Sequence, residues 1–93
     1  MAPPSPTDWT WTAIADHELE AQPTVAPPTP ATGTLMRYRD TLGLTWQRNG
    51  SAHATAWHTP PETPGLTFQG QLAWACAEHQ LSPWSATKTA TAT

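Results

Sequence analysis

The chain has 93 residues and a mass of 10.1 kDa, which is enough for one small domain with short tails. Its formal net charge is −3, it contains one cysteine, and only ten of its residues are Leu, Ile, Val or Phe. Six tryptophans supply much of the missing apolar surface, because each buried indole removes on the order of 200 Å² from water. This composition excludes a large enzyme, a transmembrane protein and a disulfide scaffold.

The N-terminal sequence, the single cysteine and the charge indicate the compartment of synthesis and exclude some classes of partner. The first residues lack a basic stretch followed by an apolar one, so we expect no signal peptide and synthesis in the cytoplasm. Cys76 has no second cysteine to pair with, so no oxidising compartment is implied. A pI near 5.7 argues against a nucleic-acid partner, and no apolar run is long enough to span a membrane.

Residues 1–21 are predicted to form an N-terminal helix or arm. Ser5 as N-cap, Pro6 at the first helical position and Asp8 three residues after the cap together form a helix start. The apolar stripe of this helix consists of Trp11, Ile14, Ala15 and Leu19. The alternative is a short strand, because residues 9–13 alternate between apolar and threonine side chains.

A proline-rich linker precedes the segment with the strongest strand pattern. Residues 22–34 contain four prolines and no charge, which predicts an extended, polyproline-like connector. Within residues 35–59, Asp40–Gly43 predicts a tight turn and Asn49-Gly50 predicts a two-residue hairpin loop. The sequence therefore predicts a three-stranded antiparallel meander over residues 35–59.

The two predicted turns set the register of this meander, with Tyr38 opposite Trp46 and Trp46 opposite His53. Alternation along each strand then divides the side chains between two faces. The face expected to cover the core carries Met36, Tyr38, Leu44, Trp46, His53, Thr55 and Trp57. The opposite face carries Arg37, Arg39, Thr45, Gln47, Ala52, Ala54, Ala56 and His58.

Residues 67–81 are predicted to form a helix that begins at Thr67 and ends before Pro83. Its apolar face carries Phe68, Leu72, Ala75, Cys76 and His79. Packed on the tryptophan face of the meander, this helix completes a small α+β domain over residues 35–83. Residues 84–93 lack periodicity and are predicted to form a flexible tail.

The segment from Tyr38 to Trp46, YRDTLGLTW, resembles a Y-R-D-x-x-G-x-x-W pattern of short, uncharacterised actinobacterial and actinophage proteins. In those proteins the pattern forms a β-hairpin, and a short helix follows it. The resemblance implies the same order of hairpin and helix in this chain and an actinobacterial or actinophage origin. It implies no catalytic activity.

Neither a metal site nor a catalytic centre is predicted. Cys76 and His79 share one face of the predicted helix and His53 faces them, which leaves the tetrahedral shell of a zinc ion one ligand short. His17 completes that shell only if the N-terminal segment folds back. A thiol on the apolar face of a helix is not activated as a nucleophile, and no phosphate loop or catalytic triad pattern stands out. We therefore expect a non-enzymatic protein with no metal and no cofactor.

Tryptophan and arginine side chains are the candidate interaction residues. So small a core cannot bury every indole, and exposed tryptophans are typical interface anchors, which selects Trp9, Trp11, Trp74 and Trp84. On the second face of the meander, a candidate patch for an anion or a protein partner consists of Arg37, Arg39, Gln47 and His58. The alternative is that this face is an ordinary solvated sheet surface.

These features predict a protein that acts by binding other proteins. In the first hypothesis it is an accessory or structural component of a larger assembly such as a phage virion, with Trp9 and Trp11 anchoring the N-terminal arm on capsid, tail or other subunits. In the alternative hypothesis it is a soluble intracellular adaptor or inhibitor, phage-encoded in one version. That protein binds a host protein through the face of Arg37 and Arg39. Both hypotheses are compatible with a homo-oligomer.

Overall fold

The strands of the described residues pair into two antiparallel sheets. The computed structural model describes residues 4–41, 46–48, 56–76 and 80–93. One sheet has the strand order β1-β2-β5 and consists of β1 (Trp9–Ala13), β2 (Leu19–Pro23) and β5 (Trp57–His58). The other has the order β4-β3-β6-β7 and consists of β4 (Gln47–Arg48), β3 (Ala31–Asp40), β6 (Thr67–Cys76) and β7 (Lys88–Thr91). A single 3₁₀ turn, η1 (Ala15–His17), connects β1 to β2 within this part of the chain.

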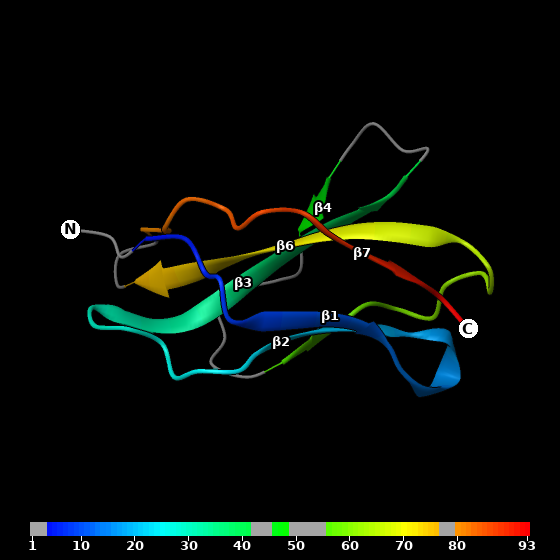
Figure 1. Ribbon diagram of the computed structural model, residues 1–93, viewed down its shortest axis with the longest axis horizontal. Coiled ribbons are helices and arrows are strands. Elements are labelled where there is room, and N and C mark those ends of the chain that lie inside the picture. The colour runs from blue at the N-terminus through cyan, green and yellow to red at the C-terminus, as the bar shows by residue number, and fades with distance from the viewer. Residues whose placement is uncertain (1–3, 42–45, 49–55, 77–79) are drawn as a thin grey trace.

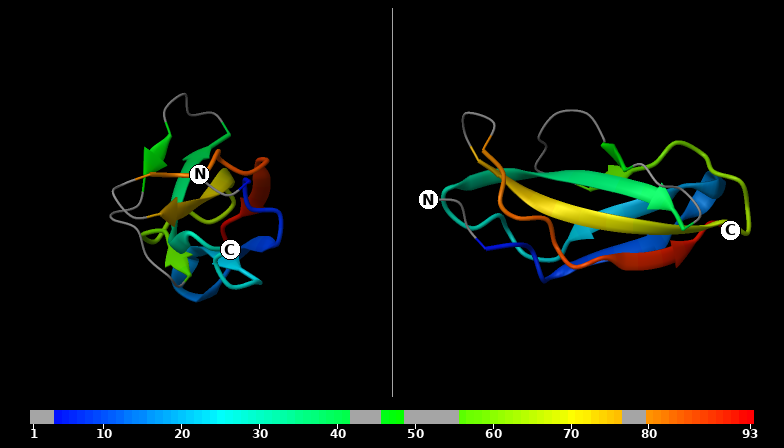
Figure 2. Two further views of the ribbon diagram at one scale, coloured as in Figure 1. Left: turned by 90° about the vertical axis from the view of Figure 1, so that its left-hand side faces the viewer. Right: turned by 90° about the horizontal axis from the view of Figure 1, so that it is seen from above.

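The two sheets lie face to face and form a β-sandwich (Figure 1). Seen from the end in Figure 2, they form two layers, and the described chain begins and ends at opposite ends of the 39 Å long axis. Between the layers lies a core to which both sheets contribute. Its buried residues are Trp9, Trp11, Leu19, Ala21, Met36, Tyr38, Phe68, Leu72 and Ala92.

The N-terminal segment forms strands, so the predicted N-terminal helix is wrong and the alternative strand is confirmed. In β1 the indoles of Trp9 and Trp11 are buried, whereas Thr10 and Thr12 are exposed. This alternation places both indoles on the core face of a strand. A helix would have turned Trp9 and Trp11 by about 200° relative to each other, onto different sides of its axis.

The predicted helix over residues 67–81 is also wrong, because β6 occupies Thr67–Cys76 in the centre of the four-stranded sheet. In a strand, every second residue lines one face, and here the core face consists of Phe68, Gly70, Leu72, Trp74 and Cys76. β6 pairs with β3 on one side and with β7 on the other, so its backbone groups are satisfied without a helix. The described residues therefore form an all-β fold, and the α+β assignment is corrected.

Of the predicted meander, the first two strands pair as β3 and β4, but the end of the third, β5, belongs to the other sheet. β5 pairs with β2 in the three-stranded sheet, with His58 opposite Glu20. β3 instead takes β6 as its main partner, from Ala31 opposite Cys76 to Asp40 opposite Phe68. These are pairings between segments far apart in the sequence, and turn patterns carry no information about them.

The register between β3 and β4 differs by one residue from the predicted one. Tyr38 lies opposite Gln47, not opposite Trp46, and Arg37 lies opposite Arg48. A shift of one residue moves every side chain of a strand to the other face of the sheet. Trp46 therefore lies with the arginines on the outer face, and its predicted place in the core is corrected. The predicted turns and the segment around His53 lie outside the described residues.

All four predicted segments contribute to the sandwich. The predicted arm (1–21) supplies β1 and the start of β2, and the end of the predicted linker (22–34) belongs to β3. The predicted tail (84–93) supplies β7, which pairs with β6 from Thr67 opposite Thr91 to Gly70 opposite Lys88.

Trp11 joins the two sheets through its contact with Gly70. A Cβ atom placed on Gly70 would lie 2.7 Å from Cε2 and 2.8 Å from Cδ2 of the Trp11 indole, so the ring lies directly against the glycine backbone. The indole N–H donates a buried hydrogen bond to the carbonyl oxygen of Phe68, 3.1 Å away. The ring also packs beside Tyr38, with 6.3 Å between the ring centroids. The large apolar ring is thus buried without leaving its polar group unpaired.

Two further contacts connect the layers. The indole N–H of Trp57 in β5 lies 3.1 Å from the hydroxyl and 3.2 Å from the carbonyl oxygen of Thr34 in β3. On the other side of the sandwich, Lys88 Nζ donates to the carbonyl oxygen of Trp9 at 2.8 Å and lies 5.2 Å from the centroid of the Trp9 indole. Each contact gives a polar group of one sheet a hydrogen-bond partner in the other sheet, which aliphatic side chains could not supply.

The phenol group of Tyr38 is an unusually weak acid. Burial, together with the negative charge of Glu62 and a hydrogen bond from the phenol to Glu62 Oε1 at 3.4 Å, raises the pKa of Tyr38 from 10.0 to about 12. All of these effects favour the neutral phenol in the folded protein.

Replacement of Gly70 by alanine tests the contact with Trp11. In an ordinary strand, Gly→Ala stabilises by roughly 0.5–1 kcal/mol, since glycine loses more backbone freedom on folding. Here the new methyl group overlaps the Trp11 indole, so Gly70→Ala is expected to lower the free energy of unfolding by about 1–3 kcal/mol. Urea denaturation measures this change. In the double variant with Trp11→Phe the loss from Gly70→Ala should shrink, and a stabilising Gly70→Ala would contradict the contact.

Alkaline titration tests the environment of Tyr38, which is the only tyrosine of the chain. Because the folded-state pKa lies above the unfolded value, the neutral phenol stabilises the fold fully below pH 10.0, and this contribution is lost as the pH rises towards about 12. Ultraviolet absorbance of the phenolate should give a midpoint near 12 in the folded protein. Glu62→Gln should lower that midpoint. A midpoint at 10.0 in a protein that is still folded would show that the phenol is solvated.

Candidate functional site

An alternating stack of arginine and tryptophan side chains covers part of the outer face of the four-stranded sheet. The guanidinium carbon of Arg37 lies 4.8 Å from the centroid of the Trp46 indole and 4.4 Å from that of Trp84. The guanidinium carbon of Arg39 lies 4.3 Å from the centroid of Trp46. The order Arg39, Trp46, Arg37, Trp84 defines what we call the arginine–tryptophan ladder. Each pair has the geometry of a cation–π interaction.

The arginines of the ladder are also held from below by glutamines of β6. Arg37 Nε donates to Gln71 Oε1 at 2.7 Å, and Arg39 Nε donates to Gln69 Oε1 at 2.9 Å. The amide nitrogen of Gln71 in turn donates to the carbonyl oxygen of Ser85 at 3.0 Å. These bonds fix the side of each guanidinium that faces the sheet, so the ladder is ordered before any partner binds.

Two buried serines place Trp84 on this face. The backbone N–H of Trp74 donates to Ser82 Oγ at 2.9 Å, and that of Leu72 donates to Ser85 Oγ at 3.0 Å. The backbone N–H groups of Ser82 and Ser85 donate back to the carbonyl oxygens of Trp74 and Leu72. The segment between the serines is thereby held along β6 by side chains as well as backbone. Neither serine could be recognised from the sequence pattern, in which Pro83 indicated only the end of a helix.

The predicted interface tryptophans divide into two groups. Trp9 and Trp11 are core residues, 3% and 5% exposed, and Trp74 is 3% exposed in a smaller buried cluster with Ala31 and Cys76. These three indoles therefore lie inside the sandwich. Trp84 is only partly buried and belongs to the ladder.

The predicted patch of Arg37, Arg39, Gln47 and His58 is brought together only in part. The two arginines share the outer face of β3, and Gln47 lies in β4, although its side chain is outside the described residues. His58 belongs to β5 in the opposite sheet and does not join them. Its separation follows from the pairing of β5 with β2, which the predicted meander did not include.

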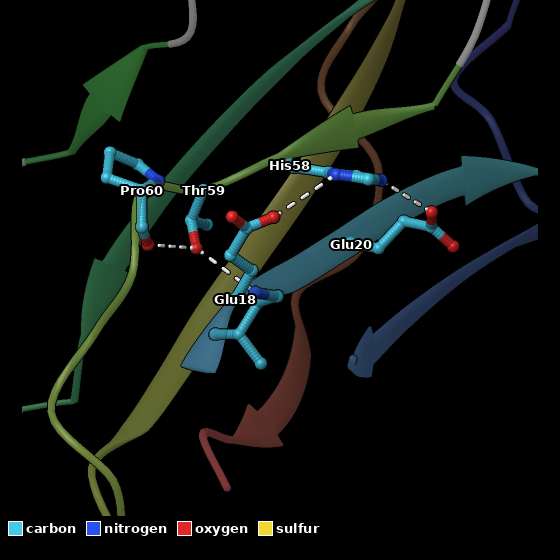
Figure 3. A network of polar contacts seen from close by, with 6 residues as sticks. Glu18, Glu20, His58, Thr59 and Pro60 are labelled. Carbon is cyan, nitrogen blue, oxygen red and sulfur yellow. Dashed lines mark hydrogen bonds and ion pairs between the residues drawn. The ribbon is translucent and has the colours of Figure 1, made fainter. Parts of the chain in front are cut away.

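His58 lies instead between two carboxylates of β2 and the residue before it (Figure 3). Its Nε2 atom is 2.7 Å from Glu20 Oε2, and its Nδ1 atom is 3.3 Å from Glu18 Oε1. Next to it, Thr59 Oγ1 accepts a hydrogen bond from the backbone N–H of Leu19 at 3.1 Å. This acidic cluster fixes the short edge strand β5 to β2.

The described part of the chain contains neither a cluster of metal-ligating side chains nor a membrane-spanning helix. Within it, no three side chains of the types His, Cys, Asp and Glu come together as a metal site requires. Cys76 is buried there as a free thiol, while His53 and His79 lie outside the described residues. Among the same described residues there is no helix with the length and apolar character needed to cross a membrane.

Replacement of Ser85 by alanine tests the support of the ladder. The change removes the acceptor of the buried Leu72 N–H, and an unsatisfied buried donor costs about 1–3 kcal/mol. We expect this loss in the free energy of unfolding, measured by urea denaturation. Thr89→Ala, at an exposed position of β7, is the control and should change stability by less than about 0.5 kcal/mol. Equal midpoints for the two variants would show that Ser85 does not hold this segment.

Solved structures resemble the fold of this chain, whereas the comparisons of its sequence found no match. No family model and no curated protein matches the chain. A solved structure described as a myokine structure is similar over 99% of this chain and 100% of its own, with a TM-score of 0.78 and 9% identity.

Two longer solved chains contain a similar domain. The titin domains A168–A170 match 96% of this chain with a TM-score of 0.61 and 15% identity, and this chain covers 32% of theirs. The titin kinase with its flanking domains matches 98% with a TM-score of 0.60 and 14% identity, and this chain covers 17% of it. At these identities the likeness shows the fold alone, which is a small immunoglobulin-like β-sandwich.

Proposed function

We propose that this chain is a non-enzymatic domain that binds another protein through the outer face of its four-stranded sheet. The observation that supports this proposal is the arginine–tryptophan ladder. Arginine and tryptophan are the residue types most enriched among the side chains that dominate binding energy at protein interfaces. In the ladder, two residues of each type lie side by side on one surface.

The four side chains of the ladder are held in place and are also partly accessible to a partner. Its four side chains are only partly buried, so each retains surface for a partner. They are already positioned by stacking and by the hydrogen bonds to Gln69 and Gln71. A partner therefore orders few new side chains on binding, and the associated entropy cost of roughly 0.5–1.5 kcal/mol per side chain is reduced.

The more specific form of this proposal is an accessory component of a larger assembly such as a phage virion. It is supported by the resemblance of the Tyr38–Trp46 segment to short actinobacterial and actinophage proteins, since Arg39 and Trp46 of that segment are themselves part of the ladder. An adaptor or inhibitor that binds a host protein through the same face is the second candidate, favoured by the two arginines. Trp9 and Trp11 are not part of this binding surface, because both indoles are buried in the core.

Affinity purification from the cells that encode the protein, followed by reconstitution, tests this proposal. We expect a protein that is enriched with the tagged wild-type chain and that binds it directly when both are purified. Arg37→Gln/Arg39→Gln should weaken this binding by at least about tenfold. A partner that is a particle subunit supports the assembly component, and a free host protein supports the adaptor.

The matched control is Gln22→Glu/Ala26→Glu, which also lowers the net charge by two but at exposed positions away from the ladder. This control should retain binding. If the purified partner binds the arginine variant as tightly as the wild type, or if the control loses binding equally, the ladder is not the binding surface and the proposal is wrong.

A further inference from the structure

We propose that a small pocket at one end of the sandwich receives a lysine side chain of a partner protein. The pocket shares no residue with the arginine–tryptophan ladder, so this second contact goes beyond the proposed function and does not depend on it. Three properties of the pocket lead to lysine: its size, the difference between its two walls, and the carboxylate of Asp8.

The pocket lies between the segment that precedes β1 and the loop that connects β2 to β3. These two segments and the end of β6 lie together at one end of the sandwich (Figure 1). The backbone N–H of Thr24 donates to the carbonyl oxygen of Asp8 at 2.8 Å, which fixes one wall to the other. Pro4 and Pro28 restrict the backbone of the two walls, so the pocket is formed before a ligand binds.

The pocket is small and reaches down to buried side chains. Its volume is about 190 Å³, whereas pockets for drug-sized ligands and cofactors usually measure about 300–1,000 Å³. Trp74 of β6 lines the pocket although it is only 3% exposed, and it belongs to the buried cluster with Ala31 and Cys76. The space therefore suits one long side chain and not a nucleotide or a larger cofactor.

The two walls of the pocket differ in polarity. The segment before β1 contributes Ser5, Thr7 and Asp8, whereas the loop after β2 contributes Val25 and Pro28. Val25 is 48% exposed, the largest exposure of a large hydrophobic side chain among the described residues. An occupant with an apolar stem and a charged end covers the apolar wall and still reaches the polar one. Lysine and arginine are the side chains with this construction.

The charge of the pocket is negative. Asp8 is the one charged residue that lines it, and within the described part of the chain the Asp8 carboxylate takes part in no hydrogen bond or ion pair. The ammonium group of Lys88 instead binds the neighbouring carbonyl oxygen of Trp9 at 2.8 Å. Residues 4–34 contain four acidic side chains and neither Lys nor Arg, so the surrounding segment also favours a cation.

The polar wall matches an ammonium group better than a guanidinium group. An ammonium group carries three donors, and Ser5, Thr7 and Asp8 are three oxygen-bearing side chains in one wall. Asp8 is exposed, so a bound ammonium group keeps part of its strong hydration. Guanidinium groups favour flat, two-pronged pairing with a carboxylate or stacking on an aromatic face. The buried position of Trp74 leaves little of such a face.

Three capped amino acids, each titrated into the full chain, serve as probes. They are the Nα-acetyl amides of lysine, of norleucine, which has the same stem without the ammonium group, and of arginine. NMR titration should show shifts of the backbone N–H signals of Thr7, Asp8 and Val25 and of the Trp74 indole N–H. Ligands of this size bind weakly, so we expect a dissociation constant of about 1–10 mM for the lysine probe. It should bind about three- to fivefold more tightly than the norleucine probe.

Two variants with the same change in net charge locate the ammonium group. Asp8→Asn should abolish the preference for lysine over norleucine. The matched control is Asp16→Asn, at an exposed position of η1 at the other end of the sandwich (Figure 1). Asparagine tolerates the left-handed backbone of that position, so the control should fold and retain the preference. The map of shifted signals in the wild-type chain gives the location independently of both variants.

Each other result would overturn the proposal. Equal binding of lysine and norleucine would show an apolar pocket without a role for charge, and tighter binding of arginine would assign the pocket to that side chain. An equal loss of the preference in both variants would show a general attraction of cations to an acidic chain. The pocket would also be excluded if the largest shifts lay elsewhere, or if about 20 mM of the lysine probe caused none. None of these results bears on the ladder.

Discussion

The sandwich depends on the contact of the Trp11 indole with Gly70 across the core. With only ten Leu, Ile, Val and Phe residues, the chain builds its core largely from aromatic rings, and a ring as large as indole needs space in the facing sheet. Gly70 supplies that space because it lacks a side chain, and the carbonyl of Phe68 satisfies the indole N–H. β6 thus accommodates the size of the indole at Gly70 and its polar N–H group at Phe68, two residues earlier in the strand.

This contact also determines what the outer face of the sheet displays. Because Gly70 faces the core, alternation along β6 places Gln69 and Gln71 on the outer side. Pairing of β6 with β3 then sets Arg39 opposite Gln69 and Arg37 opposite Gln71, where the hydrogen bonds to the arginines form. The core and the candidate binding surface are two faces of the same pair of strands, so a register error would destroy both at once.

The sequence predicted individual strands better than their partners. The alternation of residues 9–13 allowed the correct strand as an alternative, and the outward position of Arg37 and Arg39 followed from period two in β3. Residues 67–76 were misassigned because their Ala, Leu and Gln side chains are good helix formers and their apolar positions also fit one helical face. Pairing with β3 and β7 overrode that local preference.

The candidate site was predictable only in part, for a similar reason. The arginines were identified from alternation, but Trp46 was placed in the core because turn chemistry suggested a register one residue away from the actual one. Trp84 and its supporting serines join the ladder through contacts with β6, which depend on tertiary structure. Hydrogen exchange of the Trp11 indole N–H, assigned with Trp11→Phe, tests the central contact most directly. The structure predicts exchange only through global unfolding, and exchange at the rate of a solvent-exposed indole would contradict it.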